Sequence, residues 1–288
     1  MRFLSSARWM AALFLVLFLF SSGAMAETAC KATYGDGDKT FRIATGSPGE
    51  LGLVEVLAEA FNKAHGSTLC WVKAGSGKSL QLLKAKKVDG VMVHAPAAEK
   101  AAVEEVWAID RTLIGSNEFY IVGPKDDPAG IAEADSAADA YARIAEAEAT
   151  FLSRGDNSGT HKKELAIWGQ AGVQPDGDWY IETDDFMMAT LRKANEVGGH
   201  FMTDSSTWVA GKADLGDTAV LFRGDPFLVN TYHALAAPEG ATPGQELAEA
   251  FVEFVGSETG QQIIRTYGTD AYGEAMYNDA EYAKQYTH

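Results

Sequence analysis

Residues 153–164, with the sequence SRGDNSGTHKKE, join a predicted strand to a predicted helix. The preceding residues 149–152 are typical of a strand end, and residues 165–168 continue an amphipathic helix. The turn between them is rich in glycine, serine and threonine, so its backbone N–H groups can approach a ligand. The helix start adds unpaired N–H groups and the positive end of its dipole. Such a strand–turn–helix unit is typical of an anion site in an α/β protein.

One arginine stands inside this turn. Arg154 carries a fixed fork of donors that fits a planar or tetrahedral oxyanion. Ser158, Gly159 and Thr160 at the predicted helix start can add hydroxyl or backbone donors. The alternative is that Ser158 or Thr160 only caps the first helical turn. The residue types by themselves leave both interpretations open.

Strand-like and helix-like segments alternate along the rest of the chain, which predicts parallel α/β sheets. The segment 245–267 is expected to be one long amphipathic helix. The expected strands lie at 41–45, 68–73, 88–94, 118–122, 149–152, 179–182, 219–222 and 232–236.

Two further loops are expected at the carboxyl ends of strands, where ligands of α/β sheets bind. They are Thr45-Gly46-Ser47 and Gly75-Ser76-Gly77. Thr45, Ser47 and Ser76 are therefore candidate ligand donors, although Ser76 fits a plain helix cap equally well. Because these loops precede Pro124 and the arginine turn follows it, we expect one anion to be held between two lobes.

The first 26 residues have the pattern of a signal peptide. Arg2 and Arg8 give a positive start, residues 9–20 form an apolar run, and Ala24-Met25-Ala26 is a small-x-small cleavage site. The run is too short and wrongly flanked for a transmembrane helix. We therefore expect cleavage after Ala26 and export, most simply to a bacterial periplasm.

The chain is acidic, with 24 Lys and Arg residues against 40 Asp and Glu residues. The signal peptide takes 26 of the 288 residues and two of the 24 basic ones, which leaves 262 residues with a net charge of −18. This charge argues against nucleic-acid and anionic-membrane partners. Any anion must therefore be captured by local donors against the overall field.

The chain has two cysteines, Cys30 and Cys70, and we expect them to form a disulfide. Two cysteines in a protein of an oxidising compartment most often pair with each other. The bridge would tie an exposed N-terminal arm (27–39) to the second strand. A lipid anchor on Cys30 would instead need an aliphatic residue three positions earlier, where Glu27 stands. No Cys or His cluster has metal-ligand spacing, so neither a metal nor a cofactor is expected.

Three stretches resemble the periplasmic tungstate-binding proteins, which are substrate-binding components of ABC transporters. They are residues 93–99 (VHAPAAE), 121–130 (IVGPKDDPAG) and the arginine turn at 153–164. The resemblance implies the α/β fold of type II periplasmic binding proteins, with two lobes joined by a hinge of crossing strands. In this family the arginine of the S-R-G-D motif contacts the oxyanion, which implies that role for Arg154.

The implied domains are a first lobe (40–123 plus 233–288) and a second lobe (124–232). The implied function is capture of tungstate, or of molybdate, for an ABC permease in the inner membrane. The protein is expected to be a monomer and to have no catalytic activity. A ligand sensor that presents its closed form to a membrane receptor is an alternative within the same fold.

Three loops depart from the family pattern. The family has T-T-T-S where this chain has TGSP at 45–48, and T-G-Q-G-M where it has TDDFM at 183–187. It has T-D-R-G-T-Y where this chain has TDSSTW at 203–208. The exchanges add acids and remove an arginine, which is unfavourable beside a dianion if these side chains face it.

These exchanges raise the possibility of a different cargo, a small organic carboxylate. Arg154 would take its charge, and Phe186 and Trp208 would line an apolar part of the pocket. The other interpretation places these aromatics and the pair Met187–Met188 in the core of the second lobe, because Met187, Thr190 and Leu191 have helical spacing. It is favoured for the methionines and stays open for Phe186 and Trp208. Whether Asp184 and Asp185 face the ligand stays open.

Two catalytic interpretations are weaker. Ser158, His161 and Asp156 contain the residue types of a hydrolase, but they lie within one helix start and no G-x-S-x-G elbow is present. A capping histidine is the better interpretation. The stretch GSGKS at 75–79 resembles the end of a phosphate-binding P-loop, yet Val72 occupies the place of the required first glycine.

Overall fold

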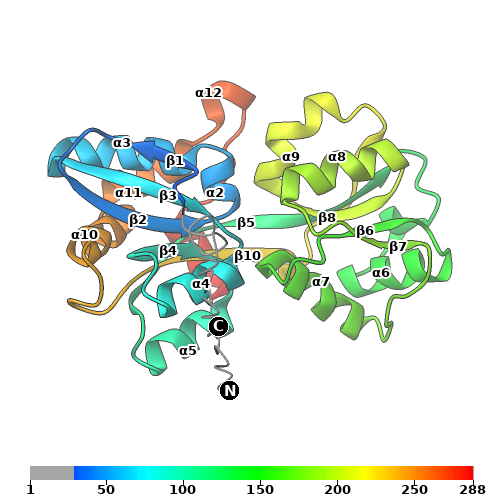
Figure 1. Cartoon of the computed structure of the whole chain (residues 1–288). Coiled ribbons are helices and arrows are strands. Elements are labelled where there is room, and N and C mark those ends of the chain that lie inside the picture. Colours follow the sequence, from blue (N-terminus) through cyan, green and yellow to red (C-terminus); the bar gives the residue numbers. More distant parts are fainter. Residues whose placement is uncertain (1–28, 288) are drawn as a thin grey trace, which may run out of the picture.

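A computed structural model describes residues 29–287. The predicted signal peptide and its cleavage site after Ala26 lie outside the described residues. Figure 1 shows two α/β lobes side by side, with two long strands running between them. Among the described residues, no helix has the length and apolarity to cross a membrane.

The first lobe, on the left of Figure 1, combines four strands with helices from both ends of the chain. Its strands are β1 (Ala32–Tyr34), β2 (Lys39–Thr45), β3 (Ser67–Lys73) and β4 (Gly90–Val93). Its helices are α2 (Ser47–Glu50), α3 (Leu53–His65), α4 (Ser76–Lys84), α5 (Pro96–Glu104), α10 (Gln245–Gly256), α11 (Glu258–Thr266) and α12 (Thr269–Tyr272). The chain then ends in α13 (Ala280–Ala283) and a 3-10 turn, Lys284–Tyr286.

The second lobe is built from the middle of the chain. Its strands are β6 (Phe151–Ser153), β7 (Tyr180–Glu182), β8 (His200–Asp204) and β9 (Thr218–Phe222). Its helices are α6 (Ala137–Glu146), α7 (Gly159–Gln170), α8 (Met187–Val197) and α9 (Ser205–Gly211), with 3-10 turns at Ile131–Glu133, Lys212–Asp214 and Pro226–Leu228.

Strands β5 (Ile109–Pro124) and β10 (Val229–Ala236) connect the lobes. They pair with each other antiparallel, and the strand order is β1-β3-β2-β4-β10-β5-β8-β6-β7, with β9 also on β5. The first part of β5 therefore belongs to one sheet and its last part to the other. This crossing pair is the hinge that the fold of type II periplasmic binding proteins requires, and it allows the lobes to close.

Strand register brings the predicted loops to one edge of each sheet. In the first lobe Thr45 on β2 lies opposite Lys73 on β3, in a parallel pair. In the second lobe Ser153 on β6 lies opposite Glu182 on β7, again in parallel. The turns that follow these strand ends lie next to one another, as the carboxyl edge of a parallel sheet dictates.

Each lobe has its own apolar core. In the first lobe α3 buries Leu53, Leu57 and Phe61, which are spaced by four residues and so share one face of the helix. In the second lobe the Trp168 ring packs on Tyr141, with ring centroids 4.3 Å apart. Met187 is buried in this second core, as its helical spacing indicated, together with Leu191.

The expected disulfide is present between Cys30 and Cys70, whose Cα atoms lie 5.3 Å apart. The arm that carries Cys30 is more ordered than an exposed tail, because β1 adds an edge strand to the sheet. Its Ala32 pairs antiparallel with Trp71 of β3. The bridge and the strand pairing therefore fasten the arm to β3 together.

The closing helix is broken where the sequence predicted one continuous element. Ser257 separates α10 from α11, in an extended conformation (φ −73°, ψ 165°), and its Oγ accepts a hydrogen bond from Gly260 N at 3.4 Å. The turn is tight, since a Cβ on Gly260 would lie 2.3 Å from the carbonyl oxygen of Phe254. An amphipathic period continues through such a break, which is why periodicity alone missed it.

Candidate functional site

Two helix starts from different lobes meet between the lobes. Gly75 is the N-cap of α4, and Ser158 is the N-cap of α7. A Cβ built on Gly75 would lie only 3.1 Å from the Cβ of Ser158. The first N–H groups of a helix have no partner inside it, so both helices direct free donors and positive dipole ends into one place. An anion is the ligand that such a place favours.

Arg154 follows β6 and is 4% exposed. Its Nε donates to the carbonyl oxygen of Asp185 at 3.1 Å, and its Nη2 is paired with Asp156. The hydrogen bonds among residues 29–287 leave Nη1 without a partner. The guanidinium is thus fixed by the protein at two nitrogens and keeps donor capacity at the third.

Asp156 connects this arginine to the helix start. Its second oxygen, Oδ1, accepts the backbone N–H of Ser158 at 3.1 Å. Ser158 Oγ accepts from the backbone N of His161 at 3.3 Å, and the ring nitrogen Nδ1 of His161 accepts from Asn157 N at 3.0 Å. A hydrolase would need the imidazole on the serine hydroxyl. Here the imidazole caps the turn, as expected of a capping histidine.

Two of the predicted donors carry buried hydroxyls with no partner. Thr45 Oγ1 at the end of β2 and Thr160 Oγ1 in the first turn of α7 make no hydrogen bond to residues 29–287, and each residue is 1% exposed. Ser76 is also buried, and its Oγ accepts from His94 N at 3.1 Å, which leaves its O–H free to donate. Buried hydroxyls without a partner are costly, so their retention is understandable where a ligand accepts from them.

Ser47 is placed differently from the other candidates. Its hydroxyl donates across the interface to Asp204 Oδ2 at 3.4 Å. Asp204 caps α9 through Thr207 N at 2.8 Å and accepts from Asn117 Nδ2 at 3.3 Å. Asn117 in turn accepts from Asn230 at 2.9 Å, so the hinge strands β5 and β10 share this network. The Ser47 side chain therefore joins the two lobes.

His94 lies at the interface in a neutral state. A Cβ on Gly159 would lie 2.5 Å from its Cε1, and its ring centroid is 5.0 Å from that of Tyr232. Burial, with the nearby positive charge of Arg154, lowers the pKa of His94 to about 3. The ring thus adds no positive charge to the site at neutral pH.

Behind the arginine turn lies a buried carboxyl group. Glu164 is 1% exposed and accepts hydrogen bonds from Ser153 Oγ at 2.9 Å and Tyr180 OH at 2.7 Å. Ser153 Oγ also accepts from Gly155 N at 3.2 Å, so Glu164 supports the turn through Ser153. Burial raises the pKa of Glu164 to about 7.

The residues at 183–187, which depart from the family pattern, differ in whether they face the solvent or Arg154. Asp184 and Asp185 are both exposed, and the carboxylate of Asp185 accepts the N–H of Phe186 at 2.7 Å. Phe186 is half-buried and its ring lies 5.4 Å from the Arg154 Cζ. Trp208 packs against the core of the second lobe. The carboxylates of the added acids therefore remain in solvent, while the Phe186 ring and the backbone carbonyl of Asp185 reach the arginine.

A groove of about 340 Å³ opens between the lobes beside the helix starts. The beginning of α5 lines one wall, and α7 with Lys162 and Lys163 lines the other. Lys163 Nζ donates to the carbonyl oxygen of Phe227 at 2.8 Å. These cations give the interface a local positive charge in an acidic protein.

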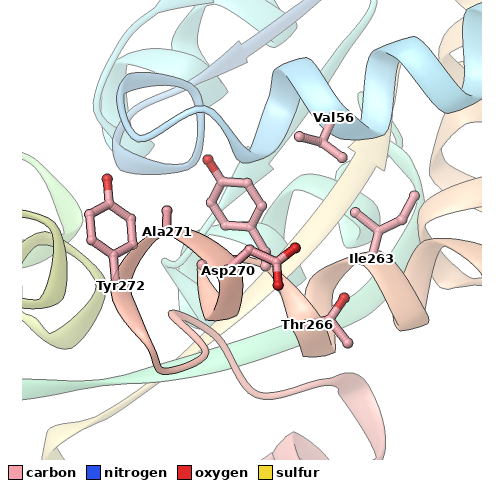
Figure 2. A pocket seen from close by; sticks show the side chains of 8 residues that line it. Val56, Ile263, Thr266, Asp270, Ala271 and Tyr272 are labelled. Carbon is pink, nitrogen blue, oxygen red and sulfur yellow. The ribbon is translucent and has the colours of Figure 1, made fainter.

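Another hollow, of about 360 Å³, lies on the first lobe away from these donors. Figure 2 shows Val56 of α3, Ile263 and Thr266 of α11, and Asp270 and Tyr272 of α12 around it. Its lining is apolar and aromatic, and its single charged group is an acid. It is therefore unsuited to an anion.

Sequence reasoning did not single out Lys73, Asp204 or Asn117 as residues of the interface. Lys73 had a usable signal, because it ends β3 just as Thr45 ends β2. Asn117 had none, since its proximity to Asp204 follows only from how the hinge folds, whereas Asp204 lies in the 203–208 stretch that departs from the family pattern. Across residues 29–287, no group of three or more His, Cys, Asp or Glu side chains is placed to hold a metal ion.

The chain matches known proteins over most of its length. The family model of the PBP superfamily domain matches residues 31–259. The tungstate-binding protein TupA of Peptoclostridium acidaminophilum is 33% identical over 267 residues, which is 88% of this chain and 93% of that protein.

Two solved structures are similar in both sequence and fold. The tungstate ABC transporter structure from Geobacter sulfurreducens is 36% identical with a TM-score of 0.72, over 81% of this chain and 100% of that one. TupA from Desulfovibrio alaskensis G20 is 35% identical with a TM-score of 0.69, over 84% of this chain and 98% of that one. The chain therefore belongs to the PBP superfamily and, within it, to the family of the tungstate-binding proteins, which are binding proteins and not enzymes.

Proposed function

We propose that this protein is the extracytoplasmic solute-binding component of an ABC transporter and captures an oxyanion. Tungstate is the first candidate ligand and molybdate is the second. The observation that carries the proposal is the meeting of two helix starts, at Gly75 and Ser158, beside the buried Arg154. Free N–H groups, dipole ends and a guanidinium converge there, which is the donor set that a small dianion needs.

The proposed ligand donors come from both lobes. Arg154 supplies the charge, and Thr45, Ser76 and Thr160 supply hydroxyls. Ser158 and Gly159 shape the start of α7, where the backbone donors lie. Ser47 was expected to be a donor; because its hydroxyl turns to Asp204, we propose that it stabilises closure instead.

The same donor set accounts for selection of a fully deprotonated anion. The carboxylates nearest the donors, Asp156 and Asp204, are already occupied by protein N–H and O–H groups. Neither carboxylate therefore has an oxygen without a protein donor, which disfavours a protonated ligand whose O–H needs an acceptor. The fixed size of the closed site would separate tungstate and molybdate from the smaller sulfate.

The partner would be the permease of the transporter in the inner membrane. The protein would work in the periplasm as a monomer that closes on its ligand. Trp208 packs against the core of the second lobe, which does not favour an apolar pocket for an organic carboxylate.

Isothermal titration of the mature protein with tungstate, molybdate, sulfate, phosphate and small carboxylates tests the proposal. Tungstate should bind tightly, and Arg154→Gln should weaken it about 100-fold or more, because a charge-assisted contact to a dianion is lost. Arg192→Gln, at an exposed position of α8, removes the same charge elsewhere and should leave affinity nearly unchanged. Binding of a carboxylate but of no oxyanion would overturn the proposal.

A further inference from the structure

Phe186 lies between two cations that belong to different lobes. The Nζ of Lys73, at the end of β3 in the first lobe, is 3.9 Å from the centroid of the Phe186 ring. The Cζ of Arg154, in the second lobe with Phe186, is 5.4 Å from the same centroid. Both distances lie within the range of a cation–π contact. The other cation–π contacts within residues 29–287 each join groups of one lobe.

The surrounding hydrogen bonds fix the backbone that carries the Phe186 ring. Its backbone N donates to Asp185 Oδ1 at 2.7 Å, and its carbonyl oxygen accepts from Thr190 N at 2.9 Å in the first turn of α8. The carbonyl oxygen of Asp185 accepts from Arg154 Nε at 3.1 Å. The guanidinium and the backbone that carries the ring are therefore linked directly within the second lobe.

Lys73 is held by a residue of its own lobe. Its Nζ lies 3.0 Å from Glu50 Oε1, and its side chain is 26% exposed. The ammonium thus projects from the first lobe onto the face of a ring in the second. Opening of the hinge must separate Lys73 from Phe186 and admit water to the face of Arg154 that the ring covers.

We infer that Lys73 and Phe186 form a closing latch over Arg154 and set the rate at which the bound anion is released. The inference rests on the proposed function. A bound oxyanion can leave only after the lobes part, so the free energy of the Lys73–Phe186 contact adds to the barrier for dissociation. Association starts from the open form, in which this contact is absent, and is therefore little affected.

Stopped-flow measurement of tungstate dissociation tests this role. Phe186→Leu keeps apolar bulk and removes the π face, and Lys73→Met keeps the stem and removes the cation. Each should speed dissociation about five- to tenfold. Phe186→Tyr and Lys73→Arg retain the contact and should stay within about twofold of the wild type. The double variant Lys73→Met/Phe186→Leu should be no faster than either single variant, because both break one contact.

The matched control is Lys84→Met. It removes the cation that lies 5.0 Å from the Trp107 ring, a contact made entirely within the first lobe. Its tungstate dissociation rate should equal that of the wild type. The inference is overturned if Lys73→Met and Phe186→Leu release tungstate at the wild-type rate, or if their effects multiply in the double variant.

A ligand-free readout separates this inference from the proposed function. If the latch exists, Lys73→Met and Phe186→Leu should shift the unloaded protein toward the open form and raise its radius of gyration in X-ray scattering, whereas Lys84→Met should not. If the wild type binds no tungstate, the proposed function fails, and this scattering comparison alone decides the latch. Equal radii for all four proteins would then reject it.

Discussion

The imidazole of His94 lies directly against the Cα of Gly159. A Cβ built at that glycine would come within 2.5 Å of Cε1, 2.7 Å of Nδ1 and 3.0 Å of Nε2 of the ring. His94 follows β4 in the first lobe, and Gly159 begins α7 in the second. The contact therefore exists only when the lobes are together, and it leaves no room for a methyl group.

Gly159→Ala should prevent full closure and weaken tungstate binding at least tenfold. The added methyl group meets a whole ring, which the surrounding aromatic residues keep from moving aside. The stability of the unloaded protein should hardly change, because the open form has space at this position. Titration calorimetry and thermal melting of the same samples measure the two quantities.

Gly169→Ala is the matched control on the same helix. A Cβ at Gly169 would have no heavy atom within 4 Å, so affinity should be unchanged and the helix slightly more stable. If Gly159→Ala binds tungstate as tightly as Gly169→Ala does, the lobes do not close on the ligand in this arrangement.

Thr45→Val and Thr160→Val should each weaken tungstate binding roughly tenfold or more without reducing the stability of the unloaded protein. Valine has the shape of threonine, and each hydroxyl is buried without a partner, so its removal costs the empty protein nothing. A loss of affinity would then report a hydrogen bond made only to the ligand.

Thr218→Val is the control, and it should lower stability without changing affinity. The Thr218 hydroxyl donates to Asn195 Oδ1 at 2.9 Å, a contact made within the second lobe. Its removal should lower the free energy of unfolding by about 1 kcal/mol and leave affinity intact. Thr45→Val and Thr160→Val variants that lose stability but not affinity would contradict the assignment of these hydroxyls to the ligand.

The parts of this site that are local in sequence could be predicted. The turn around Arg154 combines a strand end, small residues and a helix start within twelve residues, and each feature has a direct structural meaning. The same holds for the loops at Thr45 and Ser76, because strand ends of a parallel sheet share one edge. The disulfide between Cys30 and Cys70 could be predicted because the chain has two cysteines and a signal for export to an oxidising compartment.

The contacts between the lobes could not be predicted in this way. Ser47 and Asp204 are separated by 157 positions, and nothing in the periodicity of either segment encodes their meeting. The contact of Lys73 with Phe186 has the same origin. The first part of β5, from Ile109, was also missed, because its half-buried residues show no clear alternation. Each of these features depends on how the hinge packs.

Reduction of the Cys30–Cys70 disulfide should lower the free energy of unfolding by about 4 kcal/mol, because the bridge closes a loop of 40 residues. Urea unfolding with and without dithiothreitol measures the effect. Cys30→Ser, at an exposed position, should unfold at the lower midpoint whether or not reductant is present. Equal midpoints for reduced and oxidised wild type would mean that the pairing of β1 with β3 alone holds the arm.

Glu164 should make stability fall as pH rises through a defined window. Its ordinary pKa is 4.5, and burial raises the pKa in the folded protein to about 7. Between these values the folded state binds the proton more tightly than the unfolded chain does. The stabilisation is therefore complete below about pH 4.5 and is lost as the pH rises through 7.

Urea unfolding of the wild type and of Glu164→Gln at pH 5 and pH 8 isolates this contribution. The free energy of unfolding of the wild type should fall relative to that of the variant by up to about 3 kcal/mol between the two conditions. His94, whose pKa is lowered, acts in the opposite direction, but both proteins contain it and its effect cancels. The exposed Glu146, replaced by glutamine, should show no such difference. A constant difference between wild type and Glu164→Gln would mean that Glu164 stays ionised behind the arginine turn, balanced by its hydroxyl donors.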